Sequence, residues 1–111
     1  MNEYTPDRWI IIEIKQEGEE PWRRILSAWY GGYLGANSWR LSSGITKIIE
    51  HEKHYEIHNE SGSIYTCYKT SIGTSSLSAS ILNSWSAQAD ERDDFEISVI
   101  GVEELLTKED Y

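Results

Sequence analysis

Short β-forming segments, each ended by turn residues, make up most of this 111-residue chain. Residues 8–14 are typical, since they hold four isoleucines and a tryptophan and lead into a polar stretch with Gly18 and Pro21. Runs of this kind are typical of strands. Further strands are expected at residues 22–30, 38–42, 45–50, 54–59, 63–70 and 95–102. Neighbouring segments joined by short turns pair most simply as hairpins, so the sequence predicts a mostly antiparallel sheet of five to seven strands.

One segment has helical spacing instead. Leu77, Ile81, Leu82 and Trp85 fall on one face of a helix, and residues 74–76 offer hydroxyl groups as N-caps. Five serines between positions 76 and 86 weaken the intrinsic helix propensity. Packing on the sheet must therefore supply most of the helix's stability. Together these elements predict an α+β fold with one α-helix packed on a face of the sheet.

The chain length fits one domain over residues 1–111, in which we expect the acidic stretch 103–111 to fray. Cys67 is the single cysteine, so no intrachain disulfide can form, and its position among aromatic residues predicts a buried, unreactive thiol.

No apolar run has the length of a membrane span, and residues 1–4 do not resemble a signal peptide. These features lead us to expect a cytoplasmic protein without a membrane partner.

The formal net charge of −9 opposes direct binding to nucleic acid, because phosphate contacts need clustered Lys and Arg. Acidic residues gather at residues 17–20, 90–94 and 103–110. A charge run is usually a solvated face. A second interpretation is a negative stripe that imitates nucleic acid and docks onto a basic partner.

Two long windows are almost free of charge. Arg40 is the only charged residue in 25–46, and Lys69 is the only one in 61–89. Together the windows hold 51 residues, where the overall charged share of 26% would place about 13 charges. They are also rich in Gly, Ser, Trp and Tyr. A buried core sheds charge but does not call for so many hydroxyl groups, because buried hydroxyls need hydrogen-bond partners.

A ligand pocket explains this mixture. Aromatic faces stack on planar rings, hydroxyl and backbone N–H groups hold oxygens, and a lone Arg or Lys binds an anionic group. The expected ligand is a planar anion such as a nucleotide. The candidate lining residues are Trp29, Tyr30, Tyr33, Trp39, Arg40, Ser42, Ser43, Ser61, Ser63, Tyr65 and Lys69. The alternative is a Trp- and Tyr-rich core with glycine turns.

Catalytic and cofactor motifs are not found, so we expect neither an enzyme nor a bound cofactor. On a strand, His54, Glu56 and His58 would point to one side and could hold a metal ion. They lie in a highly charged stretch, however, and a solvated strand face explains them better. We therefore predict no metal site.

Three segments resemble those of small uncharacterised proteins of tailed bacteriophages. They are residues 29–33 (WYGGY), 38–45 (SWRLSSGI) and 61–69 (SGSIYTCYK). The similarity runs from about Tyr4 to Trp85. It implies a small accessory protein of a bacterial host cytoplasm that acts against host defences.

Two functions are therefore expected. The first is a non-catalytic sponge that sequesters a nucleotide-derived immune signal, with Arg40 and Lys69 on its phosphates and Trp39 with Tyr33 or Tyr65 on its base. The second is an acidic inhibitor that blocks a host defence enzyme by nucleic-acid mimicry or surface docking. A homo-oligomer interface is left open as the location of the pocket.

Overall fold

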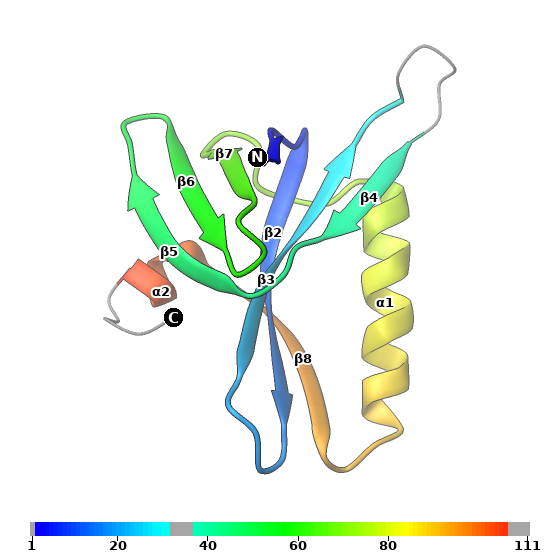
Figure 1. Cartoon of the computed structure of the whole chain (residues 1–111). Helices are drawn as coiled ribbons and strands as arrows, with labels where there is room; N and C mark the ends of the chain where they lie inside the picture. The colour runs from blue at the N-terminus through cyan, green and yellow to red at the C-terminus, as the bar shows by residue number, and fades with distance from the viewer. Residues whose placement is uncertain (1, 32–36, 107–111) are drawn as a thin grey trace.

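The computed structural model describes residues 2–31 and 37–106, which form eight strands and two helices (Figure 1). In chain order the elements are β1 (Glu3–Tyr4), β2 (Arg8–Gln16), β3 (Trp22–Trp29), β4 (Ser38–Leu41), β5 (Ile45–Glu50), β6 (His54–Asn59), β7 (Ile64–Tyr68), α1 (Ser76–Asp90), β8 (Phe95–Ile100) and α2 (Val102–Leu106). The α+β class with mostly antiparallel strands and one main helix is confirmed.

The strands divide between two four-stranded sheets rather than forming one. The first sheet has the order β1-β7-β6-β5, and the second has the order β4-β3-β2-β8. All neighbours are antiparallel except β1 and β7, which pair in parallel. The chain crosses from the second sheet to the first in the three residues 42–44 between β4 and β5. A link this short resembles an ordinary turn in the sequence, so the division between sheets was not predicted.

The larger core lies between the two sheets. Trp9, Ile11 and Ile25 of the second sheet pack with Tyr55, Ile57, Tyr65 and Cys67 of the first, and α2 adds Val102 and Leu105. Cys67 is fully buried, and burial raises the pKa of its thiol. The expectation of a buried cysteine is therefore confirmed, and its low reactivity stays a prediction.

A second core lies on the opposite face of β2 and β3, under α1. Successive strand residues face opposite sides, so Ile10 and Ile12 point away from the first core and join Leu26. Leu82 and Trp85 of α1 pack against them, as the helical spacing predicts. In Figure 1 the helix runs alongside the sheet of β4, β3, β2 and β8. The molecule thus has three layers: sheet, sheet and helix.

Helix α1 begins with two serines that cap each other. The Ser75 hydroxyl accepts a hydrogen bond from the Ser78 backbone N–H at 3.1 Å, and the Ser78 hydroxyl accepts one from the Ser75 N–H at 2.9 Å. This arrangement is a capping box, which satisfies donors that the first helical turn leaves free. The N-cap predicted within residues 74–76 is confirmed.

Most strand positions are as predicted, and two short elements were missed. Residues 45–50 and 54–59 form strands with the predicted ends. The two-residue β1 and the five-residue α2 were not predicted, and α2 occupies part of the tail expected to fray. The last five residues, 107–111, lie outside the described part. No helix in the described part is long and apolar enough to cross a bilayer.

Candidate functional site

Three of the predicted site residues, Trp29, Arg40 and Tyr65, meet around Tyr4. Strand β1 pairs with β7 so that Tyr4 lies beside Tyr65, and their ring centroids are 4.9 Å apart. The Arg40 guanidinium carbon lies 4.7 Å from the centre of the Tyr4 ring. Trp29 is 6.1 Å from Tyr4 between ring centroids, and its indole N–H donates to the Thr5 carbonyl at 3.1 Å. We call Tyr4, Trp29, Arg40 and Tyr65 the Arg40 cluster.

Within the Arg40 cluster, the buried Tyr65 hydroxyl interacts with the Arg40 guanidinium. Tyr65 is fully buried, and its hydroxyl has no hydrogen bond of ordinary geometry to any described residue. Burial raises the pKa of Tyr65, and the nearby Arg40 guanidinium partly offsets the rise. Arg40 itself is exposed and has no ion pair with a carboxylate of the described residues. A cation left unpaired in so acidic a chain could bind an anion.

The four predicted serines lie together, but they hydrogen-bond to the protein itself. The Ser42 hydroxyl accepts a hydrogen bond from the Ile25 N–H at 2.8 Å and donates to the Ser43 carbonyl at 2.7 Å. The Ser43 and Ser61 hydroxyls are 3.0 Å apart, and those of Ser61 and Ser63 are 3.1 Å apart. These bonds tie the crossing between the sheets to the turn after β6. In this structure the serine hydroxyls stabilise the connection between the two sheets.

The remaining predicted residues lie elsewhere. Lys69 pairs with Glu50 at 2.7 Å and lies 5.1 Å from the centre of the Tyr55 ring, so its contacts are not those of the Arg40 cluster. Trp39 faces the helix, with its ring centroid 5.4 Å from that of Trp85. Tyr30 is exposed, and its backbone N–H donates to Asp7 at 2.8 Å. Tyr33 lies outside the described residues.

Surface hollows do not coincide with the predicted lining. Four hollows of about 570, 310, 180 and 310 Å³ occur over the described residues, and none of the four is lined by any of the eleven predicted residues. A site for a planar ligand usually buries most of that ligand in a preformed hollow. The Arg40 cluster therefore offers a contact for an anion more than an enclosing pocket.

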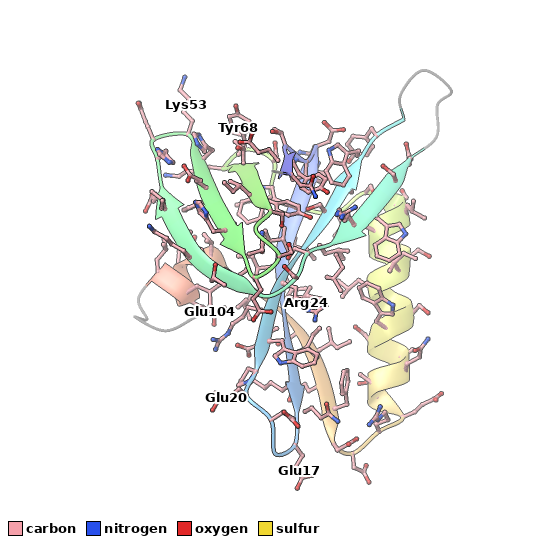
Figure 2. The ribbon with its side chains drawn as sticks, viewed as in Figure 1. Glu17, Glu20, Arg24, Lys53, Tyr68 and Glu104 are labelled. Atoms are coloured by element: carbon pink, nitrogen blue, oxygen red, sulfur yellow. The ribbon has the colours of Figure 1, made fainter. Side chains whose placement is uncertain are left out.

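The hollow of about 570 Å³ lies at an acidic end of the molecule. It lies between the β2–β3 turn and the start of β8. Figure 2 shows Glu17 and Glu20 toward the opposite end of the view from Lys53 and Tyr68. The lining residues are Lys15, Gln16, Glu17, Glu19, Pro21, Asp93, Asp94, Phe95 and Glu96. We call this surface the acidic end.

Two acidic segments that are far apart in the sequence converge there. Strands β2 and β8 pair in a register that ends at Gln16 opposite Phe95, so the segments that follow and precede these residues meet. The Glu17 backbone N–H donates to the Asp94 carbonyl at 2.8 Å, which joins the two segments directly. Each of the two acidic clusters is visible in the sequence, but the sequence does not show that they meet at one surface.

Most of this negative charge is not compensated. Five carboxylates and one amine line the hollow. Asp94 pairs with Arg92 at 3.2 Å, and this hydrogen bond lowers the pKa of the Asp94 carboxyl. Among the described residues, the other four carboxylates have no ion pair with a cation. Such a surface attracts a partner of opposite charge.

Glu56 of β6 makes side-chain hydrogen bonds to two histidines. Glu56 lies 2.6 Å from His58 and 3.2 Å from His51, and these contacts lower the pKa of its carboxyl. The His54 ring stacks on that of His51 at 4.5 Å. Over the described residues no group of three or more His, Cys, Asp or Glu side chains is arranged to hold a metal ion.

Comparison of the chain with protein-family models, with curated proteins and with solved structures found no significant match. The resemblance to small bacteriophage proteins therefore stays a prediction.

Proposed function

We propose that this chain is a non-catalytic binding protein that docks onto a basic partner protein through its acidic end. One observation carries the proposal: two acidic segments more than seventy positions apart are folded against one hollow, where four carboxylates have no ion pair with any cation of the described residues. Charges dispersed for solubility would not need to meet in this way. This is the second of the two functions expected from the sequence.

Electrostatic attraction explains how such an end would work. Charges of one sign around a concave surface raise the rate at which an oppositely charged partner arrives. Because screening acts over roughly 8–10 Å at physiological ionic strength, the attraction is strong only when the partner is close to the carboxylates. The proposal therefore expects association that weakens as salt is added. If the resemblance to bacteriophage proteins holds, the partner is a host defence enzyme.

Two charge-matched variants test the proposal. In the acidic-end variant, Glu17, Glu19 and Glu96 are changed to Gln; in the control variant, Glu3, Glu52 and Glu60 are changed to Gln. All six side chains are exposed, and each variant loses the same three negative charges. A partner captured from bacterial lysate by the wild type should also be captured by the control variant and lost from the acidic-end variant. Equal loss of the partner from both variants would show that only net charge matters, and equal capture by all three proteins would show that these carboxylates do not bind the partner.

A second candidate function follows from the Arg40 cluster. Its exposed Arg40, which has no ion pair with a described carboxylate, favours contact with a small anion, as in the expected nucleotide sponge. Thermal unfolding with cyclic dinucleotides, ADP-ribose derivatives and mononucleotides tests it. A ligand at about a hundred times its Kd should add about 2.7 kcal/mol of stability and raise Tm clearly.

The matched variants here are Arg40→Ala and Lys47→Ala. Arg40→Ala should abolish the ligand-induced shift in Tm, whereas Lys47→Ala, an exposed cation on β5, should keep it. A shift of the same size in both variants would place the ligand elsewhere. No shift with any of these compounds would exclude them as ligands of the cluster.

A further inference from the structure

We propose that the partner segment is amphipathic as well as basic, with its apolar side chains seated in a hollow beside the acidic end. This inference rests on the proposed docking function. The hollow has a volume of about 310 Å³ and lies between the second half of α1 and the second sheet. Its lining residues are Ile14, Leu41, Trp85, Gln88, Ala89, Arg92, Phe95 and Ile97.

The helix covers the sheet incompletely at this hollow. The core under α1 has three buried residues, whereas Ile14, Leu41, Trp85 and Ile97 are only partly buried. These four side chains line the hollow, together with the Phe95 ring. Apolar side chains that converge on an open hollow gain stability when a partner excludes water from them.

Phe95 links this apolar hollow to the acidic end, because it lines both hollows. It is the first residue of β8, where the α1–β8 connection reaches the sheet. On one side of this residue the lining is mainly apolar, and on the other it holds five carboxylates. An occupant that covers both hollows therefore needs apolar side chains next to Lys or Arg side chains.

The charges around Phe95 argue against other occupants. Arg92 is the only charged residue that lines the apolar hollow, and Asp94 already neutralises it through two hydrogen bonds of 3.2 Å. A fatty-acid carboxylate would thus find no free cation there and would meet the carboxylates next to it. A second copy of this chain would bring its own charge of −9 toward the same end. A basic amphipathic segment meets neither obstacle.

Three synthetic peptides of equal length test the inference by titration with NMR detection. One alternates Leu and Lys, one replaces every Leu with Gln, and one replaces every Lys with Gln. The Leu–Lys peptide should bind most tightly and shift the resonances of residues 88–97. Equal binding of the Gln–Lys peptide would show that apolar side chains are not recognised, and equal binding of the Leu–Gln peptide would show that basic ones are not. Absence of Leu–Lys binding would overturn the inference.

Protein variants then locate the apolar contact. Phe95→Ala removes a lining ring, and Gln88→Trp fills the hollow from an exposed helix position without changing the charge. Each should weaken Leu–Lys binding by roughly tenfold, since truncating or blocking a central apolar contact commonly has an effect of this size. Tyr68→Ala, at an exposed aromatic residue on β7, should leave binding unchanged. Retained circular dichroism spectra would show that each variant folds.

The outcomes separate this inference from the function on which it rests. If Phe95→Ala and Gln88→Trp bind the peptide like the wild type while the acidic-end variant does not, docking through the acidic end is supported. The inference that apolar side chains of the partner lie in the hollow is then wrong. If the acidic-end variant keeps full affinity, the proposed function itself is wrong. A dimer in solution that Phe95→Ala dissociates would show that a second copy occupies the hollow.

Discussion

Ser42 shows at the scale of one residue why composition alone does not assign a hydroxyl group to a ligand site. Its hydroxyl accepts from the backbone of Ile25, and its own backbone N–H donates to the Ile25 carbonyl at 2.9 Å. Ser42 is buried, as a core residue would be, yet it is polar because it must satisfy the backbone at the crossing between sheets. Hydroxyl groups in a charge-poor window can serve a ligand or the backbone, and the sequence does not distinguish the two uses.

Replacing Ser42 with Ala tests this structural role. The change leaves the buried Ile25 N–H without its acceptor, which should lower the free energy of unfolding by about 1–3 kcal/mol. Urea denaturation measures the loss, with Ser84→Ala on the exposed face of α1 as the control. The control should unfold at the wild-type urea concentration or slightly above it, because Ala favours the helix. If the two variants are equally stable, the Ser42 hydrogen bond does not support the crossing.

At the scale of elements, the sequence predicted what depends on neighbours in the chain. The β5–β6 hairpin was found with its ends because alternation and a charged turn are local signals. Strand β1 is too short for any such signal and exists because it pairs in parallel with the distant β7. The division into two sheets depends on which strands pair. Pairing between segments that are distant in the sequence produces no periodic pattern of residues, so the sequence does not predict it.

The cross-strand ion pair of Glu13 and Arg23 lets us predict how the stability of the fold depends on pH. Their atoms Oε2 and Nε are 2.9 Å apart on directly opposed positions of β2 and β3. Burial raises the pKa of the Glu13 carboxyl, but Arg23 and then Lys15 outweigh this and leave the pKa below its ordinary value of 4.5. A lowered pKa in the folded state means that the carboxylate stabilises the fold above pH 4.5 and that this contribution is lost as pH falls through the lowered value.

Urea denaturation between pH 7 and pH 3 measures this contribution. The wild type should lose stability more steeply than Glu13→Gln as pH falls below about 4.5, because the variant has no carboxyl to protonate. Glu60→Gln, at an exposed residue, should follow the wild-type curve. Parallel curves for Glu13→Gln and the wild type would show that Arg23 does not hold the Glu13 carboxylate.

At the scale of the whole molecule, the candidate site arises from strand order. The pairing of β2 with β8 brings the β2–β3 turn to the α1–β8 connection, so two separately visible acidic clusters become one surface. The same order of strands brings Arg40 to Tyr4 and Tyr65 but leaves Lys69 at Glu50. Reasoning from chemistry therefore named some residues that lie together, but their binding of a ligand stays a prediction, and the convergence of the acidic segments required the tertiary structure.

The affinity of the Leu–Lys peptide for the two charge-matched variants tests the docking claim most directly. Titration at physiological ionic strength should show binding about tenfold weaker or more for the variant of Glu17, Glu19 and Glu96, since it removes charges next to the bound peptide. Binding by the variant of Glu3, Glu52 and Glu60 should stay within about twofold of the wild type, because none of these residues lines the acidic end and charges beyond about 8–10 Å are largely screened. Equally weakened peptide binding in both variants would contradict the proposed docking through the acidic end, because it would show that only the net charge of the protein matters.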